Sequence, residues 1–192
     1  MTEHMPAMNN PVYADPGWIP PEAADLYLEC EHLGPASKFT DEIFQIIEHI
    51  PLFGDMSRAE VECLCRYMRC YGAPSRANLL HEGDEGHHLL IVLTGRVNVI
   101  KGTPQGITLV AAAGIGTTLG EMSMIDGANR FASCIATEPT DFAVLTRPGL
   151  SEILLDHPRL GNKLLLVLLQ LMTRRLRDAS SRLLPHIAGI AV

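Results

Sequence analysis

Residues 119–133 read Leu119-Gly120-Glu121-Met122-Ser123-Met124-Ile125-Asp126-Gly127-Ala128-Asn129-Arg130-Phe131-Ala132-Ser133. Gly120 permits a close backbone approach, and a short helix that begins near Glu121 would point free N–H groups at an anion. Arg130 offers a planar fork of donors that suits phosphate oxygens better than a lysine does. An acidic side chain would repel a neighbouring phosphate, so Glu121 makes most sense as the acceptor of a hydrogen bond from a sugar hydroxyl. The stretch therefore predicts a turn that holds an anion together with a sugar.

On both sides of this stretch, short apolar runs alternate with glycine-bearing turns. The runs cover residues 78–81, 89–93, 96–101, 107–111, 132–136 and 141–145. Many short strands at such spacing are typical of an antiparallel sandwich or jelly roll, not of a parallel sheet.

Helical patterns precede and follow the predicted strands. One helix is expected from Thr40 until Pro51 ends it, and a second from Ser57, with Glu60 at the capping-box spacing, to about Arg69. Beyond Pro148 we expect a helix over residues 150–155 and a long one over residues 158–184. The predicted fold class is therefore α+β, mainly β, with N-terminal helices and a long C-terminal helix.

The long C-terminal helix is apolar on nearly every side, so it must be covered by more than one neighbour. One side would lie on the β-domain and the other on a second copy, which predicts a homodimer. The first 38 residues are rich in proline and small polar residues. They are either a partly disordered tail, with one short helix over residues 21–32, or an arm that packs through Trp18.

Composition narrows the class of protein. The net charge is -7, which argues against broad binding to nucleic acid. Five scattered cysteines do not form a disulfide framework, there is no signal-peptide pattern at the N-terminus, and the longest apolar run is far shorter than a membrane span. We predict a cytoplasmic protein without membrane association.

Five blocks of sequence together resemble the cyclic-nucleotide-binding domain family over residues 50–184. The family comprises β-roll sensors of catabolite-activator-type transcription factors, cyclic-nucleotide-dependent kinases and gated channels. The blocks are Pro51-Leu52-Phe53 with Glu60 downstream, Glu82-Gly83-Asp84, Thr94-Gly95-Arg96-Val97, Leu119-Gly120-Glu121 and Arg130-Phe131-Ala132-Ser133. The last two match the family's phosphate-binding cassette.

The resemblance implies a β-roll that binds a cyclic nucleotide, with cAMP favoured over cGMP. It implies that Glu121 binds the ribose, Arg130 the cyclic phosphate and the Ala132 backbone N–H the phosphate, while Ser133 faces the purine. The ligand-binding residues expected are Gly120, Glu121, Met122, Arg130, Phe131, Ala132 and Ser133. Two positions depart from the family pattern. Phe131 replaces a small residue, so it either covers the base or crowds the pocket, and Arg76 stands where a turn glycine is usual.

These expectations describe a homodimeric sensor that signals through a separate effector protein. Residues 1–38 would form an extension, residues 39–148 the nucleotide-binding roll with its N-terminal helices, and residues 149–192 the dimerisation and output helices. Only residues 185–192 follow the long helix, which predicts no helix-turn-helix domain and no direct DNA binding.

Other interpretations stay open. The chain is also compatible with a dimeric scaffold that has a degenerate pocket, with a cyclic-dinucleotide sensor, and with a cupin-like metal enzyme. Catalytic spacing is not recognisable, so no enzyme, metal or cofactor is predicted. Cys63 and Cys65 do not face each other on a helix, and His81, His87 and His88 are expected in a solvated hairpin. For the arginines at 174, 175, 177 and 182, we expect either a solvated face or one arginine that reaches the base or an acid.

Overall fold

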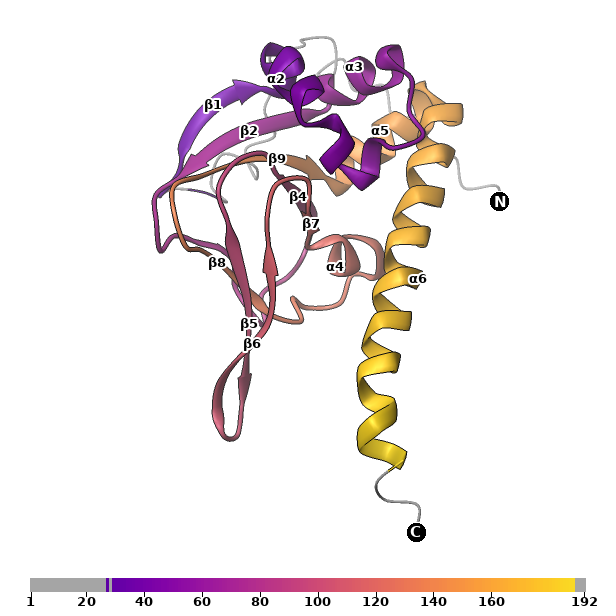
Figure 1. Ribbon diagram of the computed structural model, residues 1–192. Coiled ribbons are helices and arrows are strands. Elements are labelled where there is room, and N and C mark those ends of the chain that lie inside the picture. Colours follow the sequence, from indigo (N-terminus) through magenta and orange to yellow (C-terminus); the bar gives the residue numbers. More distant parts are fainter. Residues whose placement is uncertain (1–26, 28, 189–192) are drawn as a thin grey trace, which may run out of the picture.

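The computed structural model describes residue 27 and residues 29–188. A β-roll of two antiparallel sheets carries helices at its N-terminal end, and one long helix runs down its side (Figure 1). The predicted α+β class, with an antiparallel roll and a long C-terminal helix, is confirmed.

The two sheets enclose the interior of the roll. The first has the strand order β1 (Glu31–Pro35), β2 (Met68–Ala73), β9 (Thr140–Thr146), β4 (His88–Val92) and β7 (Thr118–Leu119). The second has the order β3 (Asn78–Leu80), β8 (Ser133–Ala136), β5 (Val97–Thr103) and β6 (Gly106–Ala113). A buried apolar cluster that includes Leu90, Val97 and Phe142 draws side chains from both sheets.

All six strands predicted from the apolar runs are present, but β1, β2 and β7 were missed. The second predicted helix is too long, because α3 (Arg58–Arg66) ends before Arg69, which lies in β2. β2 pairs with β9 along its whole length, and this pairing overrides the helical preference of its first residues. The helix predicted over residues 21–32 is wrong at its end, where β1 begins, and most of its range lies outside the described residues.

The N-terminal helices are shorter than the apolar periodicity suggested. η2 (Ala36–Phe39) leads into α2 (Thr40–Gln45), and the chain then tightens into the 3-10 turns η3 (Ile47–His49) and η4 (Pro51–Phe53). The predicted capping box at the start of α3 is confirmed: the Glu60 N–H donates to the Ser57 hydroxyl, and the Ser57 N–H donates to the Glu60 carboxylate at 2.7 Å.

The C-terminal helices pack on these N-terminal elements before α6 leaves the roll. α5 (Arg147–Asp156) begins behind the cap residue Thr146, and α6 (Pro158–Ala188) follows it. Leu164 and Leu168 of α6 are fully buried in the same cluster as Phe53 and Leu64. Farther along, α6 passes α4 (Glu121–Asp126) and continues beyond it (Figure 1).

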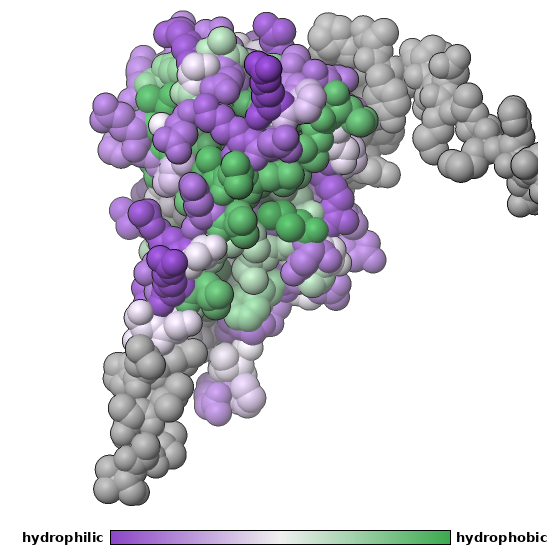
Figure 2. All heavy atoms as spheres, turned by 90° about the vertical axis from the view of Figure 1, so that its right-hand side faces the viewer, coloured by the Kyte–Doolittle hydropathy of each residue, from purple (hydrophilic) through white to green (hydrophobic). Residues whose placement is uncertain are grey.

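Apolar side chains gather on the face of the molecule that carries α6 (Figure 2). Leu166, Leu169 and Leu176 of α6 are each at least 60% exposed, and Met122 and Ile125 of α4 are also exposed. This face is a candidate interface.

Strand β6 forms one edge of the second sheet. Every residue of the strand except Ala113 is exposed, and Ile107 is exposed by 76%.

Among the described residues, no helix combines the length and the hydrophobicity that crossing a lipid bilayer requires.

Candidate nucleotide-binding site

The turn predicted around Gly120 is present. Gly120 has φ +81°, and α4 begins at the next residue, Glu121. A Cβ atom at Gly120 would lie 2.6 Å from Nη1 of Arg130. Glycine is therefore needed at this position both for its left-handed backbone and for the space that the guanidinium occupies.

Arg130 points into the protein and is only 4% exposed. Its Nη1 donates to the carbonyl oxygen of Gly120 at 2.7 Å, and its Nη2 donates to the carbonyl oxygen of His88 at 2.8 Å. Nη2 also lies 3.3 Å from Nδ1 of His88. These contacts bind the start of the cassette to strand β4.

No carboxylate of the described residues forms an ion pair with Arg130. Burial lowers the pKa of Arg130, the nearby groups Tyr27, Cys134 and Glu121 oppose this shift, and the guanidinium stays charged at neutral pH. Buried charges in proteins are normally paired. The environment of Arg130 therefore suits an added anion.

Glu121 is 1% exposed and is held by α6 instead of by Arg130. Its Oε1 accepts a hydrogen bond from Nη1 of Arg175, and Nη2 of Arg175 donates to the Thr118 carbonyl. The other carboxylate oxygen, Oε2, is buried without a partner. A buried acceptor without a donor is costly, so Oε2 is the place where a ligand hydroxyl would gain most. Of the predicted arginine cluster, Arg175 is thus a residue that reaches an acid.

Phe131 faces away from the buried guanidinium. Along the chain, Arg130 and Ala132 are buried whereas the Phe131 ring is 56% exposed. The Lys101 ammonium lies 4.3 Å from the centre of this ring. Phe131 therefore does not crowd Arg130, and its ring stands at the outer surface.

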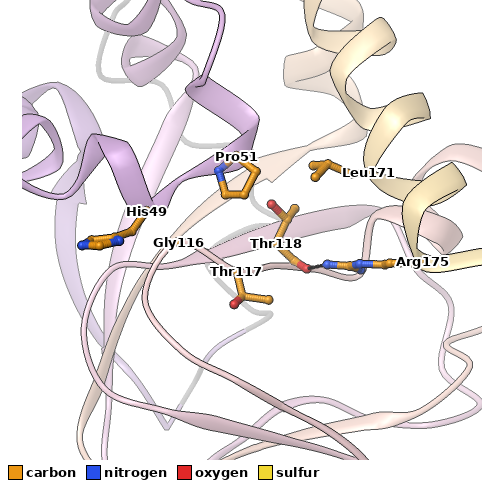
Figure 3. Close-up of a pocket in the computed structure, with 7 residues that line it drawn as sticks. All are labelled: His49, Pro51, Gly116, Thr117, Thr118, Leu171 and Arg175. Atoms are coloured by element: carbon orange, nitrogen blue, oxygen red, sulfur yellow. Dashed lines mark hydrogen bonds between the residues drawn. The ribbon is translucent and has the colours of Figure 1, made fainter. Parts of the chain in front are cut away.

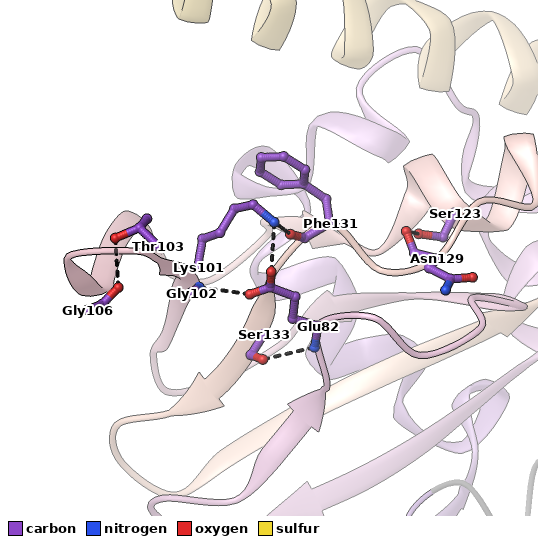
Figure 4. A network of polar contacts seen from close by, with 9 residues as sticks. All are labelled: Glu82, Lys101, Gly102, Thr103, Gly106, Ser123, Asn129, Phe131 and Ser133. Carbon is purple, nitrogen blue, oxygen red and sulfur yellow. Dashed lines mark hydrogen bonds and ion pairs between the residues drawn. The ribbon is translucent and has the colours of Figure 1, made fainter.

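A polar network fixes the end of the cassette to the second sheet (Figure 4). Nζ of Lys101 donates to Glu82 at 2.8 Å and to the Phe131 carbonyl at 2.6 Å. The Ser133 hydroxyl accepts from the Glu82 N–H at 2.9 Å, which leaves its own proton free to be donated elsewhere.

A small cleft of about 130 Å³ lies between η4, the turn before β7, and α6 (Figure 3). Its lining includes Pro51, Thr118, Leu171 and Arg175. The hydroxyl oxygen of Thr118 is buried there without a partner. The cleft lies beside the contact between Arg175 and Glu121, whereas Arg130 is not one of its lining residues.

The histidines differ from the sequence prediction. His81 and His87 are exposed beside Asp84 and Glu85, as expected for a solvated hairpin. His88 is 3% exposed, and this part of the prediction was wrong. The signal was present, since His88 precedes Leu90 and Val92 with the two-residue period of a strand face that turns inward. Within the described residues, no cluster of three or more His, Cys, Asp or Glu side chains could hold a metal ion.

Arg147 was not singled out from the sequence. From the start of α5, its Nε donates to the Met124 carbonyl at 2.7 Å and its Nη2 to the Ser123 carbonyl at 2.9 Å. It thereby closes the C-terminal end of α4, where a cation is favoured. The cassette helix is thus bound directly to the helix that precedes α6.

Comparison with known proteins gives the site a family context. A family model described as cyclic nucleotide-binding domain matches residues 73–157. The crystal structure of a cyclic nucleotide-binding domain from Methylobacillus flagellatus KT is 52% identical, with a TM-score of 0.76, and the match covers 84% of this chain and 94% of that one.

Two curated relatives extend the likeness. The cyclic AMP receptor protein of Thermus thermophilus is 30% identical over 134 residues, which are 69% of this chain and 60% of that protein. The cAMP-dependent protein kinase regulatory subunit of Yarrowia lipolytica is 28% identical over 60% of this chain and 30% of its own length. The chain thus spans less than two thirds of either curated relative. It belongs to the cyclic nucleotide-binding domain family.

Proposed function

We propose that this protein is a cytoplasmic sensor that binds a purine 3′,5′-cyclic nucleotide, cAMP in preference to cGMP. The observation that carries the proposal is the buried guanidinium of Arg130, which has no carboxylate partner among the described residues. Three contacts occupy Arg130, and a guanidinium has five N–H donors. Donors therefore remain for the oxygens of a cyclic phosphate.

Glu121 and Arg130 divide the recognition of the ligand. Glu121 accepts a hydrogen bond from the ribose 2′-hydroxyl at Oε2, the oxygen that lacks a donor. Gly120 connects the two residues, because it directly precedes Glu121 in the sequence and its carbonyl oxygen accepts a hydrogen bond from Arg130. The backbone N–H of Ala132 adds a donor to the phosphate, and the Ser133 hydroxyl lies toward the purine. The names of the Thermus and Yarrowia relatives support cAMP as the ligand.

The signal leaves the site through α6. Arg175 of α6 holds one oxygen of Glu121 while the ribose engages the other, so a bound ligand favours one position of the helix. Such a shift requires that the ligand bind two helix positions with different affinity. Two copies associate through α6, and the pair acts on a separate effector protein. The regulatory relatives favour a sensor without catalytic activity.

Calorimetric titration of the purified protein with cAMP and cGMP tests the proposal. Arg130→Ala should weaken cAMP binding by about 10- to 100-fold, as expected for loss of a charge-assisted contact. Arg159→Ala is the matched control, because Arg159 is an exposed arginine on the first turn of α6. If neither nucleotide at millimolar concentration gives heat of binding or a thermal shift, the sensor proposal is refuted and the interpretation as a scaffold replaces it.

Analogues of the ligand test the role of Glu121. Glu121→Gln should weaken cAMP binding, whereas 2′-deoxy-cAMP should bind the wild type and the variant about equally, since the hydroxyl that Glu121 accepts is missing. Equal losses for both ligands would contradict the assignment of Glu121 to the ribose.

A further inference from the structure

A buried series of hydrogen bonds runs from Tyr27, which precedes β1, through His88 to Arg130. The Tyr27 hydroxyl lies 2.7 Å from Nε2 of His88, and Nδ1 of His88 lies 3.3 Å from Nη2 of Arg130. The exposed fractions of the three side chains are 6%, 3% and 4%, so water competes little for any of these contacts.

The direction of the hydrogen bonds follows from Arg130. A guanidinium can only donate, so Nδ1 of His88 must be the acceptor and must carry no proton. The proton of the neutral ring then lies on Nε2, which donates to the Tyr27 hydroxyl oxygen. Burial, followed by the positive charge of Arg130 and by the neighbouring His87, lowers the pKa of His88 to about 3, which is consistent with a neutral ring.

Tyr27 is held firmly at the other end of the series. Its ring centre lies 5.0 Å from that of Phe142 and 5.1 Å from that of Tyr71, inside the roll. Its carbonyl oxygen accepts from the Cys30 N–H at 3.0 Å, one residue before β1 begins. β1 in turn pairs with β2, so Tyr27 is connected to a strand that belongs to the first sheet.

We propose that Tyr27 and His88 are positioning residues, which together fix the Arg130 guanidinium where it receives the anionic part of the ligand. The part of this inference that concerns affinity rests on the proposed function. The ligand affinity then depends on a residue outside the range matched by the family model, which begins at residue 73.

The expected size of the effect is moderate. Arginine is a long and flexible side chain, and immobilising such a side chain on binding opposes association. A guanidinium that is already fixed before binding avoids this loss. Removing the fixation should weaken nucleotide binding by about 3- to 10-fold.

The test compares three variants of the full chain. Tyr27→Phe removes the hydroxyl and keeps the ring packing, and His88→Leu removes both ring nitrogens and keeps a buried apolar side chain. Tyr67→Phe is the control, because the Tyr67 hydroxyl bonds Asp156 at 3.4 Å, in a different part of the molecule.

Two measurements keep the inference separate from the proposed function. Nitrogen-15 NMR of the His88 ring and of the Arg130 guanidinium needs no ligand. In the wild type it should show the Nε2–H form and slow guanidinium rotation, and rotation should be faster in Tyr27→Phe and His88→Leu but not in Tyr67→Phe. Titration with cAMP should show the 3- to 10-fold loss in the same two variants.

The outcomes are distinct. Unchanged guanidinium rotation in both Tyr27→Phe and His88→Leu would overturn the inference, even if cAMP binds. If the Arg130 guanidinium rotates faster in Tyr27→Phe and His88→Leu but the wild-type protein binds no cyclic nucleotide, the positioning role of Tyr27 and His88 is supported. The proposed function is then refuted instead.

Discussion

Arg76 has an unusual backbone for its residue type. It is the non-glycine residue with positive φ in the described part of the chain, at +72°. An L-residue in this conformation is disfavoured by roughly 1 kcal/mol or more relative to glycine. The sequence already suggested a turn glycine here by resemblance, and the backbone explains why.

Arg76→Gly should therefore stabilise the protein by about 1 kcal/mol and raise the melting temperature by about 2–4 °C. Thermal unfolding followed by circular dichroism measures the change. Gly95→Ala is the opposite control, since Gly95 has φ +75° and a Cβ there would lie 2.4 Å from Oγ1 of Thr140. A stability of Arg76→Gly below that of the wild type would contradict the expectation.

His88 makes stability depend on pH. Its pKa falls from 6.5 to about 3 in the folded protein, so below pH 6.5 the unfolded chain binds a proton that the folded one does not. Stability should therefore fall as the pH drops from about 6.5 toward 3, by about 2 kcal/mol between pH 8 and pH 5.

Denaturant titration at several pH values measures this slope. Glu60 also has a lowered pKa, of about 2, through its bonds to Lys163 and Ser57. The stability that this carboxylate contributes is present above its unfolded pKa of 4.5 and is lost as the pH falls below that value. Burial and the charge of Asp156 raise the pKa of Glu152, and this shift opposes the effect of His88 because it adds stability as the pH falls. The comparison with His88→Leu therefore separates the contribution of His88 from that of the carboxyl groups. The variant His88→Leu should lose most of the slope, and a slope unchanged in that variant would assign it to other groups.

At the scale of the elements, α4 and α5 are joined by one side chain. Arg147 donates to two carbonyls at the C-terminal end of α4, and its own N–H donates to the His87 carbonyl at 2.7 Å. Because α4 has only six residues, such contacts from outside supply much of what fixes it.

Arg147→Met should destabilise the protein by about 1–3 kcal/mol and speed hydrogen exchange in residues 121–127, because two charge-assisted bonds are lost. Hydrogen exchange with mass spectrometry measures the local effect. Arg159→Ala, on the exposed side of α6, should change neither quantity. An unaltered rate of hydrogen exchange in α4 would show that the hydrogen bonds from Arg147 are not needed to hold this helix.

The sequence predicted elements well where a local signal was strong. The capping box at Ser57, the cassette turn at Gly120 and the long C-terminal helix are local patterns, and they are present. β1 and β2 depend on pairing with distant strands, so no short window revealed them. The partners of Arg130 and Glu121 come from β4 and α6, and spacing along the chain cannot specify such contacts.

At the scale of the whole molecule, α6 presents two neighbouring faces. Leu164, Leu168, Leu171 and Arg175 face the body of the protein. A second set follows on the neighbouring side of the helix and consists of Leu165, which also packs against the core, Leu169, Met172, Leu176 and Ala179. The second set has the alternating spacing of four and three residues that two packed helices require. The helix that holds Glu121 is thus also the helix that the proposed dimer would bury.

Replacing Leu169 and Leu176 together by Glu should convert the proposed dimer to a monomer, because four charges would face one another across the interface. Analytical ultracentrifugation measures the mass. Leu155→Glu is the control, since Leu155 is 80% exposed on α5 and lies outside this face. A double variant that sediments with the same dimeric mass as the wild type would exclude this face of α6 as the interface. A wild type that sediments as a monomer would refute the proposed dimer.

Strand β6 carries a further consequence for the molecule as a whole. Its backbone groups on the outer edge are open, and residues 106–113 contain no charged side chain and no proline that would discourage another strand from pairing there. In concentrated solution this edge is where copies would add to each other's sheets and begin to form fibrils. Leu109→Lys would place a charge on this exposed edge strand and would oppose such pairing.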